Sequence, residues 1–82
     1  MGDQLLVLAN LVVNPDSRLI GQQVRDLGSG RHAFVLSHAR DGQITLFPSA
    51  QTVFQAGDRL TLQTEPATLR DIHLLNRDSE PY

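Results

Sequence analysis

The sequence feature that most restricts the fold is the segment 47–62, FPSAQTVFQAGDRLTL, in which turn residues and strand residues follow one another closely. Pro48 cannot donate a hydrogen bond to a sheet, so a strand that arrives from its N-terminal side should end there. Gly57 can adopt a positive φ and Asp58 can bind nearby backbone N–H groups, which predicts a tight turn. Residues 59–64 then alternate between apolar and polar, as in a strand with one buried face.

The residues before this segment predict a β-hairpin. Asp41-Gly42 separates the run 32–40 from residues 43–46 and is typical of a two-residue hairpin turn, so these two strands should pair antiparallel. The first run contains three consecutive apolar residues, Phe34 to Leu36, which is too continuous for a strand with one face in water. We therefore expect this strand in the middle of the sheet.

A short helix is predicted before the hairpin. Ile20, Val24 and Leu27 are spaced to lie on one helical face. Gly21 falls at or near the start of this helix, and Gly28 is placed to end it as a left-handed capping residue.

The two ends of the chain complete the pattern. Residues 11–14 predict a strand, whereas residues 5–9 fit a strand or a helical turn equally well. A second helix is expected to begin at Glu65-Pro66, with an apolar stripe at Leu69, Ile72 and Leu75.

These elements predict an α+β fold: a small mixed, mostly antiparallel sheet with two short helices, in the order strand–helix–strand–strand–strand–helix. We divide the chain into a lead-in segment 1–10, a domain 11–75 and a flexible tail 76–82.

The chain length bounds how stable the domain can be by itself. Its 82 residues make one domain, and a chain of this size buries only ~60–65 % of its extended-chain surface. The core should therefore be thin, and the apolar residues 5–13 should favour a homodimer. The absence of cysteine excludes a disulfide framework and a thiolate metal cluster, and fits a reducing compartment.

The charges are few and dispersed. Seven basic residues, all of them arginine, and nine acidic residues give a net charge of -2. This pattern predicts no basic patch, and on that ground nucleic acid and anionic lipid are excluded as partners. No apolar run approaches the ~20 residues that span a bilayer, and no charged leader precedes one, so no direct membrane insertion of this segment is expected.

No catalytic or metal-binding motif stands out. Neither Ser17 nor Ser37 lies in a nucleophile motif. His38 could meet Asp41 at the end of the hairpin, but we expect both side chains in solvent. The histidines match no metal-ligand spacing: His32, His38 and His73. The sequence therefore predicts neither an enzyme nor a metal site.

Taken in order, the motifs form a recognisable set. After an opening strand come Ser-x-Leu-x-Gly, a short helix that ends in Leu, a strand with a charged turn, a strand that reaches Pro, and Gly-Asp-x-Leu before a last strand and helix. The residues that carry this pattern are Ser17, Leu19, Gly21, Val24, Leu27, Arg40, Ile44, Pro48, Val53, Gly57, Asp58 and Leu60. With them the chain resembles the TrkA-C, or RCK-C, family, the C-terminal regulatory subdomain of potassium channels and transporters, from about residue 11 to residue 75.

The resemblance implies a cytoplasmic, non-enzymatic regulatory domain of a potassium or cation channel, transporter or antiporter, held at the membrane by its parent protein. Members are usually homodimers, and some bind a small ligand such as cyclic di-AMP or another nucleotide at the two-fold interface. The ligand-binding residues that the resemblance implies are Val24, Arg25, Ala33, Phe34, Arg40 and Pro48, with Arg31 as an approximate counterpart of a family arginine. The alternative is a purely structural assembly module of a membrane transport protein, without a small-molecule ligand.

Overall fold

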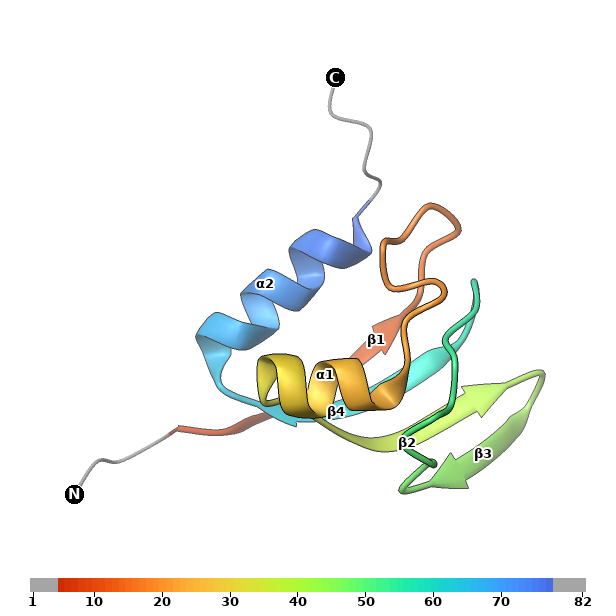
Figure 1. Ribbon diagram of the computed structural model, residues 1–82, viewed down its shortest axis with the longest axis horizontal. Helices are drawn as coiled ribbons and strands as arrows, with labels where there is room; N and C mark the ends of the chain where they lie inside the picture. The colour runs from red at the N-terminus through yellow and green to blue at the C-terminus, as the bar shows by residue number, and fades with distance from the viewer. Residues whose placement is uncertain (1–4, 78–82) are drawn as a thin grey trace.

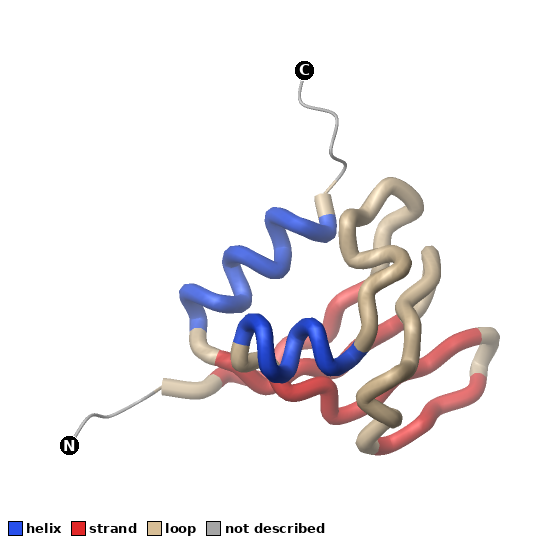
Figure 2. The backbone as a smooth tube through the Cα atoms, viewed as in Figure 1, coloured by secondary structure: helices blue, strands red, loops and turns tan. Residues whose placement is uncertain are grey.

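A four-stranded sheet forms one layer of the domain, and two helices lie together on one of its faces (Figures 1 and 2). The computed structural model describes residues 5–77. All strand pairs in this part are antiparallel, in the order β1-β4-β2-β3. The elements are β1 (Val7–Val12), α1 (Val24–Arg31), β2 (Phe34–Arg40), β3 (Gln43–Leu46), β4 (Arg59–Thr64) and α2 (Pro66–Asn76). The predicted fold class and element order are confirmed, with a sheet that is antiparallel rather than mixed.

The hairpin turn has the predicted geometry, and so does the turn at Gly57, which follows the corner of the chain at Pro48. Asp41 and Gly42 both have positive φ, 52° and 82°, which is the conformation of a two-residue hairpin turn whose twist matches the strands. Gly57 has φ 88° and precedes β4. β2 lies between β4 and β3, as expected for the middle of the sheet. Its Phe34 is nevertheless 68 % exposed, so the apolar run does not mean that both faces are covered.

β1 occupies different residues from those predicted. The strand pairs with β4 from Val7 to Val12, so residues 7–10 of the expected lead-in belong to the sheet. The prediction that the strand extends to Asn14 was wrong, because the Asn14 N–H donates to the side chain of Asn76 and the chain leaves the sheet there. Residues 1–4 lie outside the described part.

α1 begins later than the apolar spacing indicated. Ile20 is 40 % exposed and lies in a turn, and Gly21 has φ 90°, which no helical residue adopts. The helix begins at Val24, after Gln23, whose backbone N–H donates to the carboxylate of Asp26 at 2.8 Å. This bond gives a partner to the Gln23 N–H, which would otherwise be unpaired in front of the helix, and it fixes the residue at which α1 begins.

The end of α1 also differs from the prediction. The helix continues through Gly28 to Arg31, and His32, with φ 58°, is the left-handed residue that ends it. The N–H groups of His32 and Ala33 donate to the carbonyls of Gly28 and Leu27. Because the helix ends at His32, Ala33 is buried in the core. The stabilisation from this burial outweighs the preference of glycine for the capping position.

The core lies between the sheet and the helices. α2 contributes Ile72, which is fully buried, with Leu69 and Leu75 packed beside it, as the predicted stripe required. The buried apolar residues are Leu11, Val13, Leu19, Leu27, Ala33, Val35, Phe54, Leu60, Leu62 and Ile72. Four of them lie in connecting segments, so the loops complete a core that the regular elements alone would leave open: Val13, Leu19, Ala33 and Phe54.

Asn76 belongs to the fold and not to the expected tail. It is the last residue of α2, its side chain is buried, and its amide donates to the carbonyl of Val12 at 2.8 Å. The tail residues 78–82 lie outside the described part. Between residues 5 and 77, neither helix is long and apolar enough to cross a membrane.

Candidate functional site

The N-terminal turn of α1 lies against the chain that follows the corner. The N–H of Val24 donates to the carbonyl of Thr52, and that of Arg25 to the carbonyl of Ala50, both at 2.9 Å. Ala50 is two residues beyond Pro48. The structure therefore places two of the residues that the resemblance names, Val24 and Arg25, against a segment that follows a third, Pro48, closely in the chain.

Two arginines, Arg25 and Arg31, supply positive charge around α1. We call the exposed side of this helix the α1 surface. Arg25 is exposed, and its Nε donates to the side-chain oxygen of Gln23 at 2.7 Å. Arg31 is half-buried and lies six positions further along the helix, about 9 Å along its axis. Six positions also turn about 240° around a helix, so the two side chains leave α1 in different directions and do not form a single tight pocket.

Ala33 and Phe34 do not share a surface. Ala33 is 1 % exposed and packs in the core, so only its backbone is available to a ligand. Phe34 is opposite Gln63 of β4 and adjacent to the buried Val35, which places its ring on the sheet face away from the helices. Phe34 is thus separated from Arg25 by the thickness of the sheet.

Arg40 is only half-buried, but contacts within the protein hold its guanidinium group. Its Nε donates to Oδ1 of Asp58 at 2.9 Å, and its Nη2 donates both to Oδ2 of Asp58 and to the carbonyl of Val53, each at 2.8 Å. This is the two-bond geometry in which guanidinium and carboxylate fit best. The pairing with Asp58 raises the pKa of Arg40. Most of the donors of Arg40 are therefore used to join β2 to the segment before β4.

Asp58 is the centre of this buried cluster. Its carboxylate is fully buried and accepts two further hydrogen bonds, from Nε2 of His38 at 2.8 Å and from the N–H of Gln55 at 2.9 Å. Because a carboxylate only accepts, Nε2 of His38 carries the proton. Burial alone would raise the pKa of Asp58, but the bonds from Arg40, His38 and Gln55 outweigh it and hold the pKa far below its usual range.

The expectation for His38 was wrong. Its ring is buried and binds Asp58, not the hairpin residue Asp41. A weak signal existed in the sequence, because His38 and Arg40 are two positions apart and so lie on one face of a strand. A register shift between Val35 and Ser37 moves this pair to the buried face. Single-sequence alternation cannot reveal such a shift.

The depressed pKa of Asp58 predicts a loss of stability in acid. An aspartate in the unfolded chain titrates near ~3.9, so the unfolded state binds this proton at a higher pH than the folded state does. The stabilisation is complete above about pH 5 and decreases as the pH falls below the unfolded pKa. Urea midpoints should fall between about pH 5 and pH 3, and less steeply for Asp58→Asn. Equal slopes for the two proteins would contradict the assignment.

Neither of the two serines considered in the sequence belongs to the cluster around Asp58. Ser17 is buried, and its hydroxyl accepts the N–H of Leu19, while Ser37 lies on β2 facing away from the cluster. Two of the histidines, His32 and His73, are exposed on α1's cap and on α2. In the described range 5–77, no three His, Cys, Asp or Glu side chains are grouped to hold a metal ion.

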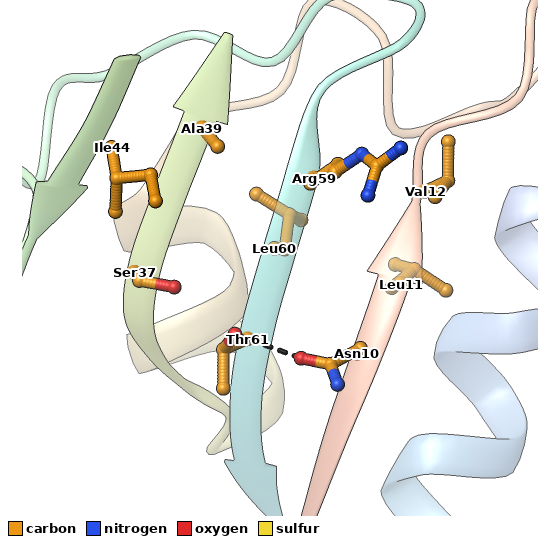
Figure 3. A pocket seen from close by; sticks show the side chains of 9 residues that line it. All are labelled: Asn10, Leu11, Val12, Ser37, Ala39, Ile44, Arg59, Leu60 and Thr61. Atoms are coloured by element: carbon orange, nitrogen blue, oxygen red, sulfur yellow. Dashed lines mark hydrogen bonds between the residues drawn. The ribbon is translucent and has the colours of Figure 1, made fainter. Parts of the chain in front are cut away.

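The sheet face away from the helices is hollowed (Figure 3). A depression of about 360 Å³ crosses all four strands, and the Thr61 hydroxyl donates to Asn10 at its floor, at 2.9 Å. Arg59 extends over it toward Val12. Its lining consists of Asn10, Leu11, Val12, Ser37, Ala39, Ile44, Arg59, Leu60 and Thr61. None of the ligand residues that the resemblance implies lies in this hollow.

Comparison with known proteins agrees with the resemblance. The model of the TrkA-C domain matches residues 8–75. The RCK_C domain dimer of S. agalactiae BusR in complex with c-di-AMP has 16 % identity and a TM-score of 0.71, over 83 % of this chain and 92 % of that chain. The GsuK channel bound to NAD has 14 % identity and a TM-score of 0.65, over 85 % of this chain and 13 % of that chain. No curated protein matches the sequence.

A third structure corrects the exclusion of nucleic acid. S. agalactiae BusR in complex with its busAB-promotor DNA has 14 % identity and a TM-score of 0.73, over 92 % of this chain and 38 % of that chain. A protein that carries this fold is thus found on DNA. The exclusion of nucleic acid as a partner was therefore wrong. It was drawn from the charge of one small domain, and that charge says nothing about what the rest of a longer protein binds. The chain spans little more than a third of BusR and about an eighth of GsuK.

Proposed function

Because the chain belongs to the TrkA-C domain family, we propose that it regulates a potassium or cation transport protein by forming a homodimer and sensing a small ligand. TrkA-C domains are regulatory and not catalytic. The family match over residues 8–75 is the observation that carries the proposal. The parent protein would hold the domain at the cytoplasmic face of the membrane.

The ligands of the structural neighbours support the choice of a nucleotide. One neighbour is in complex with c-di-AMP and another with NAD, and both ligands carry phosphate groups. Arginine binds phosphate through two parallel N–H bonds. We therefore assign Arg25 and Arg31 as the phosphate contacts, with Val24 and Pro48 beside them.

The other implied contacts would act in different ways. Arg40 would position the segment 53–58, which follows the corner, through Val53 and Asp58 instead of binding the ligand. Ala33 is buried and would contribute only backbone groups, and Phe34 would meet a ligand only across the sheet from Arg25. Ligand binding is therefore best tested by substitutions on the α1 surface.

Regulation would follow from a shift between two dimer arrangements. A ligand that binds between protomers favours the arrangement for which it has the higher affinity. The shift in equilibrium is limited by that difference in affinity, so a ligand that binds both arrangements equally would regulate nothing. The parent protein's gate would respond to the resulting change in spacing between protomers.

Calorimetric titration of the domain with cyclic di-AMP, and separately with ATP and NADH, tests the sensing role. Each charge-assisted bond from arginine is worth roughly 1.5–3 kcal/mol, so Arg25→Ala should weaken binding by about tenfold to a hundredfold. Arg70→Ala is the matched control, because Arg70 is an exposed arginine on α2 and is not one of the ligand residues that the resemblance implies.

Failure of all three ligands would favour the alternative function. If none binds with a dissociation constant below about 1 mM, close to -4 kcal/mol, the domain is better described as an assembly module that joins parts of a transport protein. Equal losses for Arg25→Ala and Arg70→Ala would instead show a non-specific attraction of phosphate to positive charge.

A further inference from the structure

The outer face of the sheet, which is the face away from the helices, is apolar in places where a face in water is normally polar. Thr45 of β3 lies opposite His38, whose buried side chain is on the helix side. Side chains alternate along a strand, so Ile44 and Leu46 point outward, where they are 70 % and 69 % exposed. An antiparallel sheet with one face in water shows the reverse pattern, with apolar residues inward and polar residues outward. The inverted alternation of β3 indicates that a partner covers this part of the outer face.

The hollow of Figure 3 is a trough with a floor of small side chains and two apolar rims. The floor is formed by Ser37 and Ala39 of β2 and Thr61 of β4. β3 supplies one rim, and the exposed Leu8 and Val12 of β1 supply the other. Neighbouring strands are ~4.8 Å apart, so three spacings separate the rims by about 14 Å. A helix with its side chains is ~10–12 Å across, so the trough is wide enough for a helix that lies along the strands.

Arg59 is the one charged side chain on the outer face of the four strands, within residues 5–77. It lies in register between Val12 of β1 and Ala39 of β2, and its guanidinium extends over the trough toward Val12 (Figure 3). Asp41, in the hairpin turn, borders a neighbouring hollow with Arg59, but the described residues form no ion pair there. A carboxylate from a partner would give Arg59 its counter-charge. Two copies of this face would bring two arginines together with no carboxylate on the strands, so a second copy is disfavoured as the occupant.

We propose that the outer sheet face docks an amphipathic helix of a partner protein, with its apolar stripe between the two rims and one aspartate or glutamate paired with Arg59. The exposed apolar side chains reach from β1 to β3, and a continuous patch of this kind marks a protein contact. A small molecule in so open a trough would keep much of its surface in water, unlike the ligand of an ordinary pocket. The contact lies on the other side of the sheet from the α1 surface, so it rests neither on ligand sensing nor on dimer formation.

A synthetic helix tests the charge pair. The probe is an alanine-based peptide of about twenty residues, since shorter helices are only marginally stable in water, with one stripe of leucines and a single glutamate in that stripe. We expect saturable binding by fluorescence anisotropy, about tenfold weaker for Arg59→Gln. A peptide with glutamine in place of glutamate should lose the same factor, and the two changes together should lose little more than either alone. Arg70→Gln, an exposed arginine on α2, is the control and should bind as the natural chain does.

A second pair of variants tests the apolar rim. Leu46→Ser should weaken binding of the same peptide by about tenfold. Leu74→Ser removes the same atoms from α2, where Leu74 is 55 % exposed, and should leave binding unchanged. Both side chains are exposed, so the urea midpoints of both variants should stay close to that of the natural chain. Absence of saturable binding, equal losses for the two leucine variants, or additive effects of Arg59→Gln and the glutamine peptide overturns the proposal.

The other occupants give different results. If the chain associates with itself at high concentration and Leu46→Ser abolishes this association, a second copy covers the face and the proposal is wrong. If sodium decanoate binds in an Arg59-dependent manner and the peptide does not, the trough is a small-molecule site and the proposal is again wrong. Failure of the peptide with retained binding of cyclic di-AMP leaves ligand sensing intact. Binding of the peptide without any nucleotide leaves the docking face intact.

Discussion

Replacement of Asp58 by alanine is expected to lower the free energy of unfolding by about 3–5 kcal/mol, as is typical when one member of a buried charge pair is removed. The change leaves the guanidinium of Arg40, Nε2 of His38 and the N–H of Gln55 without their common acceptor. Domains of this size have a net stability of roughly 5–10 kcal/mol, so the variant should lose about a third or more of its stability. Urea denaturation followed by circular dichroism measures the effect.

Two comparisons isolate the cause of this loss. Asp71→Ala removes an exposed carboxylate from α2 and should change stability by less than about 0.5 kcal/mol. The double variant Asp58→Ala/Arg40→Ala should be less destabilised than the sum of the single variants, because the second change removes a group that the first left unpaired. Additive effects would show that Arg40 and Asp58 stabilise the fold independently.

The parts of the fold that the sequence predicts well are those in which local chemistry and tertiary position agree. Asp41-Gly42 can form the tight turn by itself, and Gly57 adopts the positive φ that its lack of a side chain permits. β4 follows the predicted alternation from Arg59 to Thr64, with one face buried. In these segments no distant contact opposes the local preference.

The bounds of β1 and α1 are set by distant contacts. β4 pairs with residues 7–9, whose own pattern fits strand and helix equally, and Asn76 draws Asn14 out of the sheet. Gly28 has the residue type of a helix cap, but burial of Ala33 places the cap at His32. Local propensity is weak, and tertiary packing decides in each case.

The candidate site divides in the same way. Val24 and Arg25, which are neighbours in sequence, lie together against the chain that follows the corner. The function of Arg40 could not be read from its own neighbourhood, because it depends on Asp58, eighteen positions away. A polar residue in a strand can face solvent, a ligand or a buried partner, and the sequence pattern is the same in all three cases.

Replacement of Phe54 by alanine is the other change expected to have a large effect. Phe54 is fully buried although it lies between the corner and the turn at Gly57, outside any strand. Its N–H donates to the carbonyl of Gln22 and its carbonyl accepts the N–H of Gly21, so it fixes the connection that leads to α1. Loss of the ring leaves a cavity beside His38, whose ring centre is 6.4 Å away. The expected cost is about 3–5 kcal/mol.

Phe47→Ala is the matched control for this variant. The Phe47 side chain is 75 % exposed, so its removal should change the free energy of unfolding by less than about 0.5 kcal/mol. The two variants lose the same atoms. The difference between their urea midpoints therefore measures how much burial of the Phe54 ring stabilises the fold. Similar midpoints would mean that Phe54 is not packed in solution as the structure describes. In that case the segment that carries the Val53 carbonyl would also lose its anchor, and the positioning role assigned to Arg40 would fail with it.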